Sequence, residues 1–255
     1  MTVKVLNTPL QVCTYESLQK KLLFAKWQKL AIDFSNTHIV TMRRNDQAFR
    51  ALTDSVDLFV PDGMPLIWTM NRLGADLSDR VYGPMFTRYF LAECPSNRTH
   101  YLIGGSPECG ERFRTHMLQL NPSLRFVGGA HGKCSADGIF EKDDQILQEL
   151  QTLSPDFIWV GLGAPKQYAW IHRIKPHLSH GVLLAVGFAF DVIAGTKKDA
   201  PSWMQRSGLT WLFRSSQEPI RLLGRYAKYN TLFCFYLLKD GVFLPKTNGN
   251  RSVAP

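Results

Sequence analysis

Asp156-Phe-Ile-Trp-Val-Gly-Leu-Gly-Ala-Pro-Lys-Gln167 is the stretch of sequence that decides the fold class. It begins as an apolar run of strand length, continues through a glycine loop, and enters a helical pattern that extends to Leu178. A second apolar run, Val182–Phe190, follows. A strand, a helix and a second strand of these lengths are typical of a right-handed βαβ unit with parallel strands.

The same alternation runs along most of the chain. We expect strands at Lys29–Phe34, Val56–Pro61, His100–Ile103, Leu124–Val127, Asp156–Val160 and Val182–Phe190. We expect helices at Ser17–Gln28, Asp46–Leu52, Pro65–Leu73, Pro84–Glu93, Pro107–Leu120, Lys142–Leu153 and Pro165–Leu178. The pattern predicts an α/β, Rossmann-like fold with a doubly wound, mostly parallel sheet over residues 1–196. Residues 197–255 are predicted to form a basic, helical C-terminal appendage.

Composition excludes several classes of protein. The chain has 255 residues, of which 45% are hydrophobic and 20% charged, so it is not disordered or collagen-like. Its 5 cysteines are widely spaced and form no C-x-x-C pair, which favours neither a disulfide framework nor a zinc knuckle and predicts a cytoplasmic location. The first ten residues do not resemble a signal peptide. The longest uncharged stretch, Pro176–Phe190, is shorter than the ~20 residues that span a bilayer.

Positive charge is concentrated at the C-terminal end. The formal net charge is +9, and residues 197–255 contain ten basic and three acidic residues, so this tail carries most of the excess. Such asymmetry indicates an anionic partner. From the charge alone, nucleic acid, anionic lipid and a phosphate-bearing substrate all stay open.

Glycines and short polar residues follow the predicted strands. In a parallel sheet, the carboxyl ends of the strands meet at one rim, where ligands bind. Glycines there allow close backbone approach, and helix N-termini favour phosphate, so the rim has the outline of a nucleotide pocket. The chain has neither G-x-G-x-x-G with a downstream acid nor G-x-x-x-x-G-K-[ST], which disfavours dinucleotide oxidoreductases and P-loop NTPases.

Seven motifs are distributed over nearly the whole chain. They are Val60-Pro-Asp-Gly-Met-Pro-Leu-Ile-Trp68, Arg80-Val-Tyr-Gly83, Tyr101-Leu-Ile-Gly-Gly105, Val160-Gly-Leu-Gly-Ala-Pro-Lys-Gln167, Gly187-Phe-Ala-Phe-Asp-Val-Ile-Ala-Gly195, Ala200-Pro201 and Gly208-Leu-Thr-Trp-Leu-Phe-Arg-Ser-Ser-Gln-Glu-Pro-Ile-Arg221. In order and spacing they resemble the WecG/TagA/CpsF family of glycosyltransferases (glycosyltransferase family 26). The resemblance implies a metal-independent, inverting enzyme without a cofactor. Such an enzyme moves a sugar from a UDP-sugar to a polyprenyl-diphosphate-linked sugar at the cytoplasmic face of the membrane.

The chain departs from the common family pattern at several positions. It has Pro65 after Asp-Gly-Met, Tyr82 where Thr is usual, Tyr168 where Glu is usual, Asp199 where Arg is usual, and Phe34 where Thr is expected. The Pro65 and Tyr82 forms resemble the GumM-type glucosyltransferases of exopolysaccharide assembly and favour a glucose donor. The alternative is an N-acetylmannosamine-type donor, as in teichoic acid or enterobacterial-common-antigen-like pathways.

Asp62 is the candidate catalytic base. An inverting transfer needs a group that accepts the proton of the acceptor hydroxyl, and Asp62 ends a predicted strand at the rim. The competing interpretation is that Pro-Asp-Gly is only a good turn sequence. Asn36 and Thr37 follow the preceding strand and are predicted to bind the donor sugar, although a helix cap would use the same residues.

The leaving diphosphate must be neutralised without the Asp-x-Asp motif that holds a metal in many glycosyltransferases, because this chain has none. Fixed donors are therefore expected. The predicted donor-binding residues are Arg80, Gly104, Gly105, Gly161, Gly163, Lys166 and Gln167, with Asp191 on the uracil or ribose. Exposed charges would be the ordinary interpretation of Arg80 and Lys166, and a helix cap that of Asp191. The seven histidines form no recognisable metal-ligand set.

Four arginines of the tail are predicted to contact the acceptor diphosphate or the membrane. Arg206, Arg214, Arg221 and Arg225 would share a broad face if Ser202–Leu238 were one helix, but Pro219 predicts a break or kink. Large apolar residues between them suit an anionic membrane surface better than nucleic acid. A non-catalytic nucleotide- or RNA-binding module is the rival hypothesis. A homo-oligomer is left open.

Overall fold

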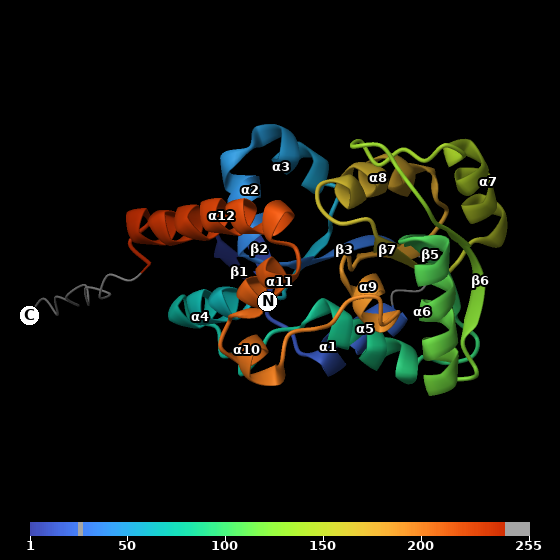
Figure 1. Cartoon of the computed structure of the whole chain (residues 1–255), viewed down its shortest axis with the longest axis horizontal. Helices are drawn as coiled ribbons and strands as arrows, with labels where there is room; N and C mark the ends of the chain where they lie inside the picture. The colour runs from blue at the N-terminus through green and yellow to red at the C-terminus, as the bar shows by residue number, and fades with distance from the viewer. Residues whose placement is uncertain (25–27, 243–255) are drawn as a thin grey trace, which may run out of the picture.

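A single mixed sheet forms the centre of the computed structural model, which describes residues 1–24 and 28–242. The strand order is β1-β2-β4-β3-β8-β7-β5-β6 (Figure 1). The strands are β1 (Thr2–Val5), β2 (Thr8–Gln11), β3 (Lys29–Ser35), β4 (Leu58–Pro61), β5 (Thr99–Gly104), β6 (Arg125–Ala130), β7 (Phe157–Gly161) and β8 (Gly181–Ala185). β1 pairs with β2 antiparallel, whereas the other neighbouring strands pair in parallel. The α/β, Rossmann-like prediction is confirmed.

Helices cover both faces of the sheet (Figure 1). They are α1 (Tyr15–Phe24), α2 (Thr37–Asn45), α3 (Gln47–Thr53), α4 (Met64–Arg72), α5 (Gly83–Ala92), α6 (Pro107–Leu120), α7 (Asp143–Leu153), α8 (Lys166–Ile174), the 3-10 turn η1 (Lys175–His177), α9 (Ala189–Ile193), α10 (Ser202–Arg206), α11 (Thr210–Gln217) and α12 (Pro219–Lys239). Strand residues alternate between two apolar cores: Ile158 joins the helices α2, α3, α7 and α8, and Trp159 joins α1, α5, α6 and α9. This alternation follows from the two-residue period of a strand.

The predicted elements match the observed ones closely, with three main differences. The β1–β2 hairpin and α2 were not expected. The predicted strand Val182–Phe190 is wrong beyond Ala185, because Gly187 adopts a positive φ of 50° and turns the chain into α9. Phe190 is nevertheless buried, so an apolar pattern alone did not separate a strand from a short helix. Of the predicted helix Ser17–Gln28, residues 25–27 lie outside the described residues.

The C-terminal segment forms three helices instead of one continuous helix. The break at Glu218 coincides with Pro219, the first residue of α12, as the kink prediction required. α12 lies along α2 (Figure 1), where Thr37 Oγ1 donates to Asn230 Oδ1 at 2.8 Å and Arg44 pairs with Asp240. Phe233 of α12 is buried in the core. The division into domains at residue 196 stays a prediction.

A helix must be both long enough and apolar enough to cross a bilayer. Within residues 1–24 and 28–242, no helix meets both requirements.

Candidate active site

The carboxyl ends of β3 and β4 bring Asn36 and Asp62 together. An ideal Cβ on Gly63 would lie 3.8 Å from the Asn36 Cβ, so the two strand ends are in contact. Asn36 Oδ1 caps α2 by accepting from the backbone N–H groups of His38 at 3.1 Å and Ile39 at 3.3 Å. The helix-cap interpretation of Asn36 is therefore confirmed. Its role in sugar binding stays a prediction that would rely on its amide nitrogen.

Asp62 is half-buried at the end of β4. Its backbone N–H donates to the Ser35 carbonyl at 2.7 Å, and the Gly83 N–H donates to its carboxylate. Burial raises the pKa of Asp62 from its ordinary 3.8 to about 8, and nearby Asp33 adds to this rise. The positive charges of Arg80 and Arg214 and the Gly83 N–H oppose it. A carboxyl group that exchanges its proton near neutral pH has the property that a general base needs.

Arg80 is buried beside Asp62, with 6% of its surface exposed, so the exposed-charge interpretation is wrong. Its Nη1 donates to the Asp62 backbone carbonyl at 3.1 Å. Its Nη2 contacts Gln205 Oε1 at 3.5 Å and Thr210 Oγ1 at 3.4 Å. The guanidinium carbon lies 4.3 Å from the centre of the Tyr82 ring. Several elements thus fix the position of one cation at the rim.

Arg214 and Arg225 bring further positive charge to the same rim. The Arg214 guanidinium lies 3.9 Å from the centre of the Phe188 ring and faces Asp62. Within the described part of the chain, the Nε atoms of both arginines are buried and have no hydrogen-bond partner. Burial, with Arg225 and Arg214 nearby, lowers the pKa of His38 to about 3. Two arginines with buried donors left over form a surface that an anion would stabilise.

The other two arginines of the predicted acceptor site are exposed. Arg206 ends α10, and Arg221 pairs through Nε with Glu218 Oε2 at 2.5 Å. Glu218 also accepts from Lys197 Nζ at 2.7 Å. The structure therefore brings Arg214 and Arg225 to the rim and leaves Arg206 and Arg221 at the surface.

The glycines of the predicted donor site lie at the ends of β5 and β7. Gly104 has a φ of 101°, and a Cβ there would come within 2.9 Å of the Gly161 backbone carbon, so only glycine fits. Gly105 follows at a φ of 71°. Gly163 lies in the loop before α8, where its carbonyl accepts from the Gln167 N–H at 3.0 Å.

Three side chains of the donor prediction lie in different environments. Gln167 is buried, and its Oε1 has no partner among the described residues. Lys166 Nζ donates to the Cys134 carbonyl at 3.0 Å, which uses one of its three N–H donors. The prediction that Asp191 directly follows a strand is wrong. Asp191 lies within α9, where it pairs with Lys197 at 3.6 Å. The cause is the early end of β8, which moves residue 191 into a helix.

Residues 3–247 match the sequence profile of the glycosyl transferase WecG/TagA/CpsF family. The chain belongs to this family. It is therefore a glycosyltransferase, as the sequence motifs predicted. It is similar to the N-acetylglucosaminyldiphosphoundecaprenol N-acetyl-beta-D-mannosaminyltransferase of Staphylococcus aureus strain MRSA252, with 28% identity over 187 residues, which is 73% of this chain and 71% of the relative. The enzyme of the same name from strain NCTC 8325 / PS 47 is 27% identical over the same shares.

The names of the relatives bear on the donor sugar. The relatives are named as N-acetylmannosaminyltransferases, so the WecG/TagA/CpsF match supports the N-acetylmannosamine-type alternative better than a glucose donor. The GumM-type branch is not confirmed.

Three of the residues that depart from the common WecG/TagA/CpsF pattern take part in two phenol–carboxylate hydrogen bonds, of which the Tyr168–Asp33 bond is fully buried. Tyr82 donates to Asp199 Oδ1 at 2.6 Å, and Tyr168 donates to Asp33 Oδ1 at 2.6 Å. Burial raises the pKa of Asp33 to about 6. Sequence reasoning missed Asp33, because a single acid in an apolar strand has no visible partner nearby. The unusual tyrosines were the available signal.

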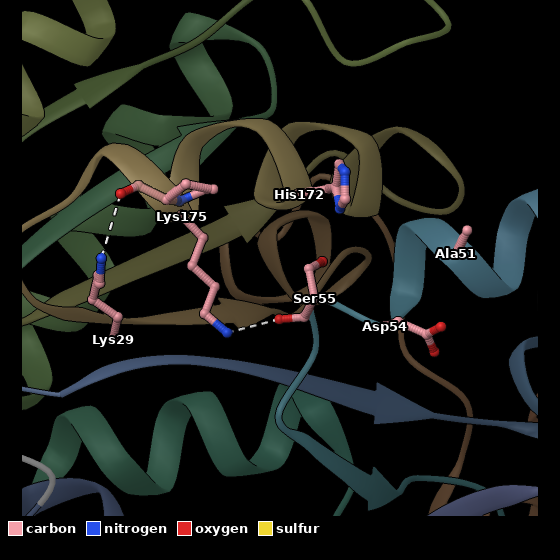
Figure 2. A pocket seen from close by; sticks show the side chains of 7 residues that line it. Lys29, Ala51, Asp54, Ser55, His172 and Lys175 are labelled. Carbon is pink, nitrogen blue, oxygen red and sulfur yellow. Dashed lines mark hydrogen bonds between the residues drawn. The ribbon is translucent and has the colours of Figure 1, made fainter.

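A separate pocket lies at the opposite end of β3, between α3 and α8 (Figure 2). In this pocket, Lys175 Nζ donates to the Ser55 carbonyl at 2.8 Å, and Lys29 Nζ donates to the Pro176 carbonyl at 3.3 Å. Its lysines thus contact backbone oxygens. Lys29 begins β3, whereas Asn36 follows the end of that strand and Asp62 follows the end of the neighbouring parallel strand β4, so the pocket is not part of the rim described above.

Proposed function

We propose that this chain is an inverting glycosyltransferase that moves an N-acetylmannosamine-type sugar from a UDP-sugar to a polyprenyl-diphosphate-linked sugar. The observation that carries the proposal is a half-buried carboxyl group, Asp62, faced by two arginines, Arg80 and Arg214. The named relatives support the sugar, and their acceptor, N-acetylglucosaminyldiphosphoundecaprenol, supports the lipid. The product would enter cell-surface glycan assembly.

Asp62 acts as the base in this mechanism. The acceptor hydroxyl oxygen attacks the anomeric carbon from the face opposite to UDP, and its proton moves to the Asp62 carboxylate. The bond between the anomeric carbon and UDP breaks at the same time, so the anomeric configuration inverts. Asn36, which follows β3 and lies beside Gly63, and the next residue, Thr37, are proposed to orient the donor sugar.

Fixed positive charge stabilises the departing diphosphate. Arg80 and Arg214 face Asp62 from different elements, and burial, together with the neighbouring charge of Arg214, lowers the pKa of Arg225. Because these groups are held in place by ring and backbone contacts, they need little reorganisation as negative charge develops on UDP. Gln167, Lys166, Asp191 and the glycines at 104, 105, 161 and 163 are proposed to bind the donor.

Activity is expected to survive chelation by EDTA. The chain has no Asp-x-Asp motif, and the positive charges of the buried Arg80 and the half-buried Arg214 beside Asp62 would neutralise the diphosphate instead of a metal. Within the described residues, no three His, Cys, Asp or Glu side chains form a group that could hold a metal ion. The measurement is transfer from a radiolabelled UDP-sugar to a synthetic lipid acceptor, before and after chelation. Loss of turnover with EDTA that Mg²⁺ or Mn²⁺ restores would contradict the mechanism.

The C-terminal helices are proposed to contact an anionic membrane surface. α12 carries exposed apolar side chains at Ile220, Leu223 and Leu238, and exposed basic side chains at Arg221 and Lys228. Apolar and basic groups on one exposed helix are typical of interfacial binding. Peripheral attachment would place the rim near the diphosphate of the lipid acceptor.

The membrane contact predicts co-sedimentation with phosphatidylglycerol vesicles. The double variant Ile220→Asp/Leu223→Asp should pellet several-fold less, because it places charges where apolar side chains would enter the interface. Both positions are exposed, so the melting temperature should be unchanged. Tight binding of single-stranded RNA at the same salt concentration, without vesicle binding, would instead favour the rival nucleic-acid hypothesis.

A further inference from the structure

A network of contacts connects Arg80 to the segment that follows the sheet. Tyr82 Oη donates to Asp199 Oδ1 at 2.6 Å, while the Tyr82 ring lies 4.3 Å from the Arg80 guanidinium carbon. Gln205 Nε2 donates to Asp199 Oδ2 at 3.2 Å. Gln205 Oε1 in turn contacts Arg80 Nη2 at 3.5 Å. The chain of contacts thus starts and ends at Arg80 and crosses 117 positions of sequence between Tyr82 and Asp199.

The arrangement gives Arg80 a counter-charge without a direct ion pair. A buried guanidinium beside a buried carboxyl normally forms an ion pair, which would lower the basicity of the carboxylate. Here Arg80 Nη1 donates to the backbone carbonyl of Asp62 at 3.1 Å. The carboxylate of Asp199 reaches Arg80 only through Gln205 and the Tyr82 ring. Arg80 therefore stays near Asp62, while its N–H groups point to the Asp62 backbone carbonyl and to Gln205 and not to the Asp62 carboxylate.

We propose that Tyr82 and Asp199, acting through Gln205, form a latch that keeps the Arg80 guanidinium on the Asp62 backbone carbonyl and away from the Asp62 carboxylate. Tyr82 is then a positioning residue that preserves Asp62 as a base and holds residues 199–210 beside the rim. The inference rests on the proposed function, because it takes Asp62 as the group that accepts the proton.

The charged groups around Asp62 make the latch testable through the pH dependence of sugar transfer. The charged and titratable groups that face Asp62 are Arg80, Tyr82, Tyr15 on α1, Asp33 on β3 and Arg214 on α11. Burial and the neighbouring Asp199 and Asp62 raise the pKa of Tyr82 far above its ordinary value, so its hydroxyl is neutral throughout the working range. Replacing it by phenylalanine changes no charge. Any shift in the titration of Asp62 then reports movement of another group.

Tyr82→Phe keeps the ring and removes the hydrogen bond to Asp199. With the latch open, Arg80 pairs with the Asp62 carboxylate, which should move the acid limb of the pH profile of kcat/KM down by about 1–3 pH units. A weaker base should also lower kcat at pH 8 about tenfold. Asp199→Asn should produce the same pair of effects. The double variant should be no slower than the slower single variant, because both changes open one latch.

Tyr101→Phe is the matched control, since it removes a phenol–carboxylate hydrogen bond of 2.9 Å between Tyr101 on β5 and Glu149 on α7, outside the latch. It should leave the pH profile of transfer unchanged. If Tyr82→Phe does not fold, Asp199→Asn and Gln205→Met give the same readout. Both side chains are half-exposed, so these substitutions should disturb the fold less.

Asp62→Asn, assayed in parallel, separates the two proposals. If Asp62→Asn is inactive and the latch variants keep the wild-type profile, or their acid limb moves to higher pH, the latch is overturned and the proposed function stands. If Asp62→Asn transfers sugar at the wild-type rate, the base assignment fails, and the latch fails with it.

Discussion

Asp62→Asn is expected to lower kcat about 10²–10⁴-fold, the usual contribution of a positioned base, while UDP still binds. The amide preserves the shape of the side chain and can still accept from the Gly83 N–H, but it cannot take up the acceptor proton. The measurement is steady-state transfer to the lipid acceptor, with calorimetric titration of UDP as the binding control. More than half of the wild-type turnover in this variant would exclude Asp62 as the base.

The pH dependence of the wild-type enzyme follows from the same residue. The base must be ionised, so kcat/KM should rise with pH as Asp62 loses its proton near its pKa of about 8. The stability of the fold should change in the opposite direction. Between the ordinary pKa of 3.8 and about 8, the folded state keeps a proton that the unfolded state has released, so stability falls as pH rises.

Asp62→Asn removes this titration. Its melting temperature should therefore fall less than that of the wild type between pH 5 and pH 8. Thermal unfolding at the two pH values measures the difference. An equal fall in both proteins would show that Asp62 is not the group whose burial opposes ionisation.

Arg214→Ala is expected to lower kcat about 10²–10³-fold, the usual cost of removing one fixed donor to developing negative charge. The guanidinium is held against Phe188, faces Asp62 and carries a buried Nε with no partner among the described residues. Because Arg214 lowers the pKa of Asp62, its loss should also move the acid limb of the pH profile to higher pH. Arg214→Lys should recover part of the rate, since it restores the charge but not the planar fork.

Arg112→Ala provides the control for this experiment. Arg112 is exposed on α6 and pairs with Glu108 at 2.8 Å, so its removal deletes an arginine of the same charge that is not one of the charges acting on Asp62. Its turnover should match the wild type. Wild-type turnover in Arg214→Ala, measured beside this control, would remove Arg214 from the mechanism and leave α11 a packing role.

Local patterns predicted most strands of the sheet and the helices between them. Each of these strands is a short apolar run that ends near glycine or a small polar residue. The βαβ unit around β7 and β8 is the clearest example, and α6 was predicted at its observed bounds. The pattern failed after Ala185, where a single turn at Gly187 converts an apolar run into a helix. It also gave no sign of α2, whose face against α12 is formed by the polar contacts of Thr37 and His38.

The sequence by itself determined the fold class, the glycosyltransferase family and the position of Asp62 at a strand end, because these depend on local periodicity and on motifs read along the chain. Only the tertiary structure decided which charges meet there. It buried Arg80, brought Arg214 from α11 to face Asp62, left Arg206 and Arg221 exposed, and paired Tyr82 with Asp199. The physical reason is that burial and electrostatic partners depend on distances in space between residues far apart in sequence, whereas a sequence pattern carries only local spacing.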